Sequence, residues 1–250
     1  MVQLLAIIGG TGLTSLETLE ITRREMVSTP YGEPSGPVTH GELSGQEVVF
    51  LARHGYAHTI PPHKINYRAN LWALKQIGVD TVLAIAAVGG IGADMAPGDL
   101  AFPNQIIDYT WSRQHTFFEG DLKQVVHIDF THPYDQALRK KLIQAAHQAQ
   151  LSAREHGVYG ATQGPRLETA AEIDRMEQDG CDLVGMTGMP EAALARELGL
   201  GYATCAVVAN WAAGRSEGII TMEEIQQNLI NGMDKVKILL RHAIPIIYRS

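Results

Sequence analysis

Short apolar segments alternate along the chain with longer amphipathic segments. Several of the apolar segments are apolar at consecutive positions, which is typical of strands that are buried on both faces of a sheet. The amphipathic segments repeat apolar residues every three or four positions, as helices with one buried face do. We predict strands at Leu4–Ile8, Val48–Ala52, Thr81–Val88, Val158–Thr162, Asp182–Met186 and Tyr202–Ala209. We predict helices at Ile65–Ile77, Tyr134–Gln150, Thr169–Gln178, Pro190–Leu198 and Thr221–His242.

Residues at the predicted helix ends support this reading. Residues 169–172 and 221–224 each run from Thr to Glu, the spacing of a capping box that satisfies free N–H groups at a helix start. Pro190 suits a first helical turn, and Gly199 suits a helix C-terminus. Strands that alternate with helices predict an α/β fold of three layers with a mixed, mostly parallel sheet. Because the chain contains no linker-like stretch or repeat, we expect residues 1–250 to form a single domain.

Composition narrows the possible partners and surroundings. Hydrophobic residues make up 45% of the chain and charged residues 19%, which allows a sizeable core without metals or disulfides. The net charge of −7 argues against a nucleic-acid or anionic-membrane partner. Cys181 and Cys205 lie in apolar segments, which fits a reduced protein but leaves one disulfide open. The N-terminus lacks the basic residues of a signal peptide, and no apolar run reaches ~20 residues, so we expect a cytoplasmic protein.

A glycine-rich turn follows the first predicted strand. Residues 8–13 read Ile-Gly-Gly-Thr-Gly-Leu, a spacing that matches neither the dinucleotide-binding fingerprint nor the P-loop. Glycines let backbone N–H groups approach a ligand closely, and Thr11 adds a hydroxyl, so the turn can bind an anion such as phosphate. A tight turn between a strand and the next element explains the glycines equally well. The turn by itself leaves both interpretations open.

Polar residues follow other predicted strands too. Arg53 and His54 come directly after the second strand, and Thr187 follows the fifth. An arginine presents a planar set of donors that matches phosphate oxygens, although a surface Arg beside a core-capping His is the commoner meaning of such a pair. In open α/β sheets the carboxyl ends of strands form the ligand site, which brings Thr11 and Thr187 to the same edge. Together these residues favour an oxyanion pocket.

Other kinds of catalytic site lack their signatures. The ten histidines are scattered without the spacing of a metal site, so we expect no metal. No G-x-S-x-G motif is present, and neither cysteine has an activating neighbour in the sequence. An enzyme of this kind relies on the reactivity of its own substrates, and a bound phosphate is one such nucleophile.

Two further polar residues lie at the same edge of the predicted sheet. Glu168 precedes a helix start, where the helix dipole favours an acid, and Asn210 follows a strand, where a turn is the ordinary explanation. Composition and spacing alone therefore predict an anion-binding α/β protein with two extra polar groups near the anion.

Several stretches, taken in order, resemble the trimeric purine nucleoside phosphorylases, and most closely their methylthioadenosine phosphorylase branch. The matching stretches are Ile7–Leu13, Leu51–Gly55, Ile65–Leu74, Pro97–Asp99, Gln163–Arg166, Gly185–Thr187 and Met189–Glu191. The resemblance implies one α/β domain with a twisted central sheet, assembled as a homotrimer. It also implies reversible phosphorolysis without a cofactor, in which inorganic phosphate as co-substrate attacks the ribose anomeric carbon and a purine leaves.

The resemblance also implies roles for individual residues. The implied phosphate ligands are Thr11, Arg53, His54 and Thr187. The implied nucleoside contacts are Met186 under the ribose, Glu168, Asn210, Trp211 and Ala212 around the base, and His127 (from a neighbouring subunit) and Met222 at the 5′ end. Asn210 is the implied catalytic residue. Ala86 stands where the branch has a hydroxyl residue, so one phosphate contact is missing or is made by the backbone of Ala87.

The chain departs from the methylthioadenosine branch where the base is read. That branch has a serine at the position of Glu168 and an Asp-x-Asp pair at positions 210–212, whereas Glu168 and Asn210 match the branch that cleaves inosine and guanosine. Glu168 accepts from the N1–H of hypoxanthine, and Asn210 donates to O6 and accepts from protonated N7. Adenine has an acceptor at N1 and a donor amino group at C6, the opposite of hypoxanthine at both atoms. The base is therefore predicted to be a 6-oxopurine.

The predicted reaction is phosphate-dependent cleavage of 5′-methylthioinosine to hypoxanthine and 5-methylthioribose 1-phosphate. Met222 and His127 carry the methylthio part of this prediction, since an apolar slot suits a thioether. Methylthioadenosine, inosine and guanosine are the alternative substrates. A non-catalytic nucleoside or phosphate sensor on the same fold is the alternative function.

Overall fold

The computed structural model describes all residues except 1–3, 14, 15, 17, 121 and 250. Its described strands form one sheet, which runs in the order β2 (Glu20–Glu25), β3 (Val38–Leu43), β4 (Gln46–Ala52), β1 (Leu5–Gly9) and β5 (Thr81–Gly90). After β5 come β10 (Leu183–Gly185), β9 (Val158–Ala161) and β7 (Gln105–Asp108). The long strand β11 (Gly201–Trp211) also pairs with β5 and extends the sheet to β6 (Leu100–Ala101) and β8 (Ala153–Arg154).

Most strand pairs in this sheet are parallel. β1 lies parallel between β4 and β5, and β5 is parallel to β11 along nearly its whole length. Antiparallel pairs join β2, β3 and β4 at one end, β10 to β5, and β6 to β11. The prediction of an α/β fold with a mixed, mostly parallel sheet is confirmed.

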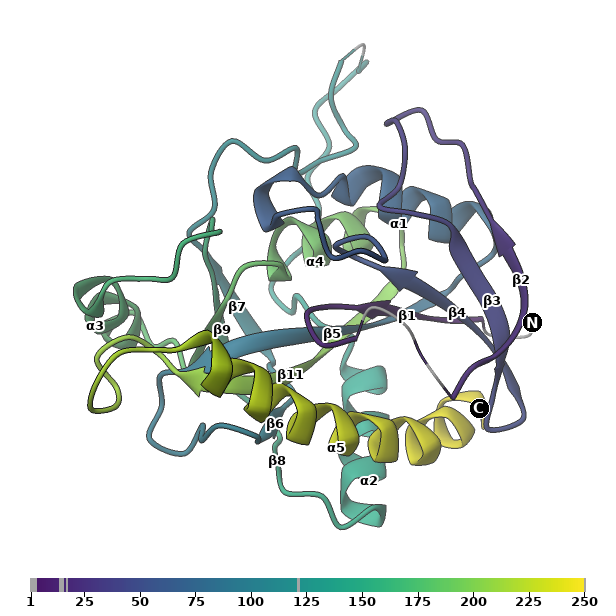
Figure 1. The fold of residues 1–250 in the computed structure, drawn as a ribbon. Coiled ribbons are helices and arrows are strands. Elements are labelled where there is room, and N and C mark those ends of the chain that lie inside the picture. Colours follow the sequence, from purple (N-terminus) through teal and green to yellow (C-terminus); the bar gives the residue numbers. More distant parts are fainter. Residues whose placement is uncertain (1–3, 14–15, 17, 121, 250) are drawn as a thin grey trace.

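Helices cover both faces of the sheet and give the fold three layers (Figure 1). On one face lie α2 (Gln136–Gln148) and α5 (Met222–Tyr248), and on the other lie α1 (Tyr67–Gln76) and α4 (Gly188–Glu197). Alternate residues of β1 enter the two layers: Leu5 and Ile7 pack with α2 and α5, whereas Ala6 and Ile8 pack with α1 and α4. Burial on both faces explains why this strand is apolar at consecutive positions. A shorter helix, α3 (Ala170–Gln178), lies beside the β7–β9 end of the sheet.

All six predicted strands and all five predicted helices are present at their predicted places. The capping box at Thr169 is complete, and the hydroxyl of Thr221 accepts from the backbone N–H of Glu224. Gly199 follows the end of α4 with a φ of +65°. The largest error is at the end of α5, which continues to Tyr248 because Ile244 and Ile247 keep its apolar face buried.

The residue pattern does not predict the strands β2, β3, β6, β7 and β8. β6 and β8 have two residues each, which is too short for any periodicity to appear. β2 is charged at four of its six positions and is exposed along most of its length, so it lacks the apolar signal of a buried strand.

Two further sequence expectations can be compared with the described residues. Cys181 and Cys205 are both free and buried, so the disulfide that the sequence left open is not formed. None of the described helices combines the length and the apolar character needed to cross a membrane.

The glycine-rich turn after β1 is shaped by space as well as by backbone conformation. Gly12 has a φ of +85°, in the left-handed region that glycine adopts without strain. A Cβ on Gly10 would lie 2.6 Å from the carbonyl oxygen of Ile85 and 3.0 Å from Nη1 of Arg53. Gly10 therefore allows the guanidinium of Arg53 to pack directly against the turn.

We expect Gly10→Ala to destabilise the protein by about 1–3 kcal/mol, because the added methyl overpacks a site closed by backbone. Gly36→Ala is the matched control, since a Cβ at Gly36 meets only Tyr56 at ordinary contact distance, 3.5 Å. Urea unfolding of both variants measures the difference. Equal stability of the two variants would contradict the packing role of Gly10.

Candidate functional site

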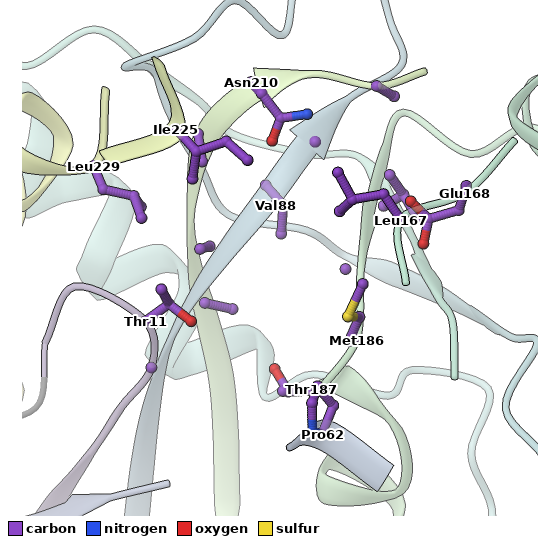
Figure 2. A pocket seen from close by; sticks show the side chains of 18 of the residues that line it. Thr11, Pro62, Val88, Leu167, Glu168, Met186, Thr187, Asn210, Ile225 and Leu229 are labelled. Carbon is purple, nitrogen blue, oxygen red and sulfur yellow. The ribbon is translucent and has the colours of Figure 1, made fainter. Parts of the chain in front are cut away.

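A cavity of about 160 Å³ opens at the carboxyl ends of β1, β4, β5 and β11 (Figure 2). Eight of the predicted site residues line it: Thr11, Arg53, His54, Glu168, Met186, Thr187, Asn210 and Ala212. Thr11, Arg53 and Asn210 meet because the parallel strands β1, β4 and β11 end at the same edge of the sheet. Thr187 reaches the cavity from β10, which runs antiparallel to the end of β5. Ala86 and Ala87 also line the cavity.

Arg53 is held by a buried ion pair with Glu191, a residue of the first turn of α4. Its Nε donates to Oε2 and its Nη2 to Oε1, both at 2.7 Å, while Nη1 donates to the carbonyl of Ile85 at 2.9 Å. Both side chains are only 1% exposed. Although burial opposes the charge of Arg53, the neighbouring carboxylate raises its pKa. The guanidinium is therefore charged, fixed in orientation, and has used three of its five N–H donors.

His54 lines the cavity, and its hydrogen bond within the protein fixes its tautomer. Its Nδ1 lies 2.8 Å from the carbonyl oxygen of Ile60, which requires that Nδ1 carries the proton and donates it. Burial, and then the positive charge of Arg53, lower the pKa of His54 to about 4. The ring is neutral near pH 7, so Nε2 has a lone pair. A lone pair can accept from the protonated oxygen of hydrogen phosphate.

Thr11 and Thr187 place two hydroxyls at the same end of the cavity. Figure 2 shows both oxygens pointing into the open space. Thr187 is the residue before α4, and its side chain makes no capping hydrogen bond to that helix. The helix start also directs partial positive charge toward this end of the cavity.

Asn210 lies at the opposite end, on a β-bulge. β11 pairs Val208 with Val88 and Asn210 with Gly89, so Ala209 is an extra, unpaired residue. Such a bulge changes the direction in which the next side chain, that of Asn210, points. The side chain of Asn228 from α5 donates to the carbonyl of Ala209 at 2.9 Å and supports the bulge. Nδ2 of Asn210 donates to the Trp211 carbonyl at 2.7 Å, and Oδ1 points into the cavity.

Glu168 faces the same end from the other wall (Figure 2). Its Oε1 accepts from the hydroxyl of Thr162 at 2.6 Å, which fixes the carboxylate. The second oxygen stays available as an acceptor for a ligand. The cavity thus has hydrogen-bond donors for an anion at one end. At the other end it has the acceptor oxygen of Asn210 and the carboxylate of Glu168.

Three predicted residues are not brought to the cavity in this chain. Met222 is the first residue of α5 and is 61% exposed, whereas Ile225 and Leu229, one and two turns later, line the cavity. The α-helical period places Met222 on the same face as Ile225 and Leu229. Met222 lies outside the cavity lining because it is at the helix start, before the part of that face which borders the cavity. Trp211 is half-buried and contributes its carbonyl to Asn210. His127 is exposed on the loop between β7 and α2.

Two structural supports of the site are not apparent from the residue pattern. One is Glu191, which stands in a matching stretch but whose partner is 138 positions away. The other is Arg113, which is buried and donates to the carbonyls of Met186, Met189 and Gln163. Arg113 thereby joins the segment before Glu168 to the segment around Thr187. Among the described residues, no three His, Cys, Asp or Glu side chains are grouped to hold a metal ion.

Comparison with known proteins gives consistent matches. The model of the phosphorylase superfamily matches residues 4–245. A probable S-methyl-5′-thioinosine phosphorylase of Pseudomonas syringae is 57% identical over 96% of this chain and 97% of its own length. A 6-oxopurine nucleoside phosphorylase of Pyrococcus furiosus is 47% identical over 97% of this chain and 92% of its own. The solved methylthioadenosine phosphorylase of Schistosoma mansoni with adenine superposes with a TM-score of 0.95, at 32% identity, over 99% of this chain and 93% of that one.

The neutral state of His54 is testable by NMR titration of its imidazole. Because burial and Arg53 lower its pKa, we expect no protonation of this ring between about pH 8 and pH 5 and a midpoint near pH 4. Unfolding releases the ring to an ordinary pKa, so His54 should lower the free energy of unfolding as pH falls from about 6.5 to about 4. A midpoint near pH 6.5 in the folded protein would contradict this assignment.

Proposed function

The chain belongs to the phosphorylase superfamily, and we propose that it catalyses the phosphate-dependent cleavage of 5′-methylthioinosine. The products are hypoxanthine and 5-methylthioribose 1-phosphate, which makes the enzyme a pentosyltransferase. The observation that carries the proposal is the arrangement of the cavity. Thr11 and Thr187 lie at one end, and Glu168 and Asn210 lie at the other. Arg53 packs against the glycine turn that carries Thr11. A nucleoside between these ends meets phosphate on its sugar and hydrogen-bonding groups on its base.

At the phosphate end, the chain's residues bind and orient the nucleophile. The remaining N–H groups of Arg53 and the hydroxyls of Thr11 and Thr187 donate to phosphate oxygens, and Nε2 of His54 accepts from the protonated one. A phosphate oxygen forms a bond to the anomeric carbon while the bond to N9 of the purine breaks. The transition state resembles a ribosyl cation, which the neighbouring phosphate dianion stabilises.

At the base end, Asn210 and Glu168 stabilise the leaving purine. The electron pair of the broken bond goes to the purine, and the proton that hydrogen phosphate loses balances the one that the purine gains. Oδ1 of Asn210, which points into the cavity, accepts from protonated N7. The N–H of Asn210 Nδ2 that is not bonded to Trp211 donates to O6. Glu168 accepts from N1–H. Asn210 is the catalytic residue in this scheme because its hydrogen bond strengthens as charge moves onto the base.

The same two residues support a 6-oxopurine rather than adenine. A buried donor that faces a donor, or an acceptor that faces an acceptor, costs about 1–3 kcal/mol. Adenine has an amino group at C6 and an acceptor at N1, so it opposes Asn210 at one atom and Glu168 at the other. The relatives named for methylthioinosine and for 6-oxopurine nucleosides agree with this choice, although the superposed structure holds adenine.

The wall between the two ends supports a methylthio group on the sugar. Ile225 and Leu229 present apolar side chains between Thr11 and Asn210 in Figure 2, and Ile220 lines the same cavity. An apolar wall suits a thioether better than a hydroxyl, which needs a polar partner. We further propose a homotrimer, in which His127 of a neighbouring subunit approaches the 5′ group.

The first test compares substrates. We expect methylthioinosine to exceed methylthioadenosine in kcat/KM by at least about tenfold, because adenine leaves two buried groups unsatisfied. Release of hypoxanthine should require phosphate. Asn210→Asp combined with Glu168→Ser should move the preference toward methylthioadenosine. Equal kcat/KM for the two substrates in the unmodified enzyme would contradict the hydrogen-bond assignment, and phosphate-independent binding without turnover would indicate a sensor.

The second test concerns the 5′ substituent. Ile225→Thr keeps the branch at Cβ but shortens the side chain and places a hydroxyl in the apolar wall, so the ratio of kcat/KM for methylthioinosine to that for inosine should fall by about tenfold. Met222→Thr is the matched control and should leave the ratio within about twofold, because Met222 lies outside the cavity lining. A loss of selectivity in Met222→Thr as large as that in Ile225→Thr would contradict this assignment of the pocket wall.

A further inference from the structure

Few charged side chains face the cavity. Three lining residues are ionisable: Arg53, His54 and Glu168. Arg53 is matched by Glu191 in a bidentate pair, His54 donates Nδ1–H to a carbonyl, and Glu168 lies at the opposite end. The other buried guanidinium, Arg113, is engaged by backbone carbonyls and does not line the cavity. Among the described lining residues, the anion therefore meets donors but no unmatched cation.

Hydrogen-bond donors surround the carboxylate of Glu191. Its Oε1 accepts from Nη2 of Arg53 and from the hydroxyl of Tyr202 at 2.9 Å, and its Oε2 accepts from Nε of Arg53. It lies in the first turn of α4, where the helix dipole favours an acid. The carboxylate thus accepts from three donors, two of which belong to the guanidinium of Arg53.

We propose that Glu191 is a positioning residue that cancels the charge of Arg53, so that the phosphate subsite binds phosphate weakly and leaves its negative charge for the transition state. This inference rests on the proposed function. A subsite with net positive charge would stabilise bound phosphate before the reaction, and it would also repel the developing ribosyl cation. In a neutral subsite the negative charge of the phosphate dianion is not cancelled by the protein. The dianion therefore attracts the ribosyl cation as it forms, and this attraction stabilises the transition state more than the ground state.

The decisive variant is Glu191→Gln, which keeps the size of the side chain and one acceptor but leaves Arg53 unmatched. We expect its KM for phosphate to fall by about tenfold and its kcat to fall by about tenfold, with the KM for the nucleoside unchanged. Glu191→Asp keeps the charge and should keep the phosphate KM within about threefold of the unmodified enzyme. A phosphate KM that rises or stays constant in Glu191→Gln, with kcat falling, would show a structural role only and would overturn the proposal.

Tyr202→Phe serves as the matched control. It removes one hydrogen bond from the same carboxylate oxygen without changing any charge. Its phosphate KM should stay within about twofold of the unmodified enzyme. A decrease as large as that in Glu191→Gln would mean that hydrogen bonding, rather than charge, sets phosphate affinity, and would likewise overturn the proposal.

A second measurement uses the unmodified protein and does not depend on the folding of any variant. Calorimetric titration with inorganic phosphate, without nucleoside, compares about pH 6, where the monoanion dominates, with about pH 8, where the dianion dominates. A neutral subsite should bind at least as tightly at the lower pH. Binding at least about tenfold tighter at the higher pH would reveal a cationic subsite and contradict the role of Glu191. Since this titration needs no turnover, its result is independent of whether methylthioinosine is the substrate.

Discussion

The ion pair between Arg53 and Glu191 is the interaction on which the geometry of the site depends. It joins the residue after β4 to the first turn of α4, two elements that border the cavity from different layers of the fold. The desolvation of two buried charges offsets much of their attraction, so such a pair contributes little net stability compared with an apolar contact. The main effect of the ion pair is to fix the position of the Arg53 side chain. With Gly10 packed against one side of the guanidinium and the Ile85 carbonyl accepting from Nη1, Arg53 has one orientation.

The parallel sheet supplies the other constraint. Strands that run in the same direction end at the same edge, so residues that follow β1, β4 and β11 meet although they are far apart in sequence. The bulge at Ala209 then turns Asn210 into the cavity, and Arg113 ties the segment before Glu168 to the one around Thr187. These backbone features place the proposed anion end and the proposed base end at opposite sides of one cavity.

Much of this arrangement can be predicted from the sequence, and its limits have physical causes. Continuous apolar runs such as Leu4–Ile8 identify buried strands, and the glycine and polar residues at their ends identify the edge that carries the site. The pairing of Arg53 with Glu191 cannot be read this way, because nothing local in a sequence encodes a contact between residues 138 positions apart. The exposure of Met222 could not be read from the sequence either. Helical spacing puts Met222, Ile225 and Leu229 on one face, and only tertiary packing decides that the cavity lies beside Ile225 and Leu229 rather than beside the helix start.

The most direct measurement is a crystal structure of the protein with both phosphate and hypoxanthine bound. We expect phosphate oxygens within hydrogen-bond distance of Arg53 and Thr187, and hypoxanthine with N7 toward Oδ1 of Asn210 and N1 toward Glu168. Phosphate bound outside this cavity, or hypoxanthine with its N1 edge turned away from Glu168, would contradict the assignment of the two ends.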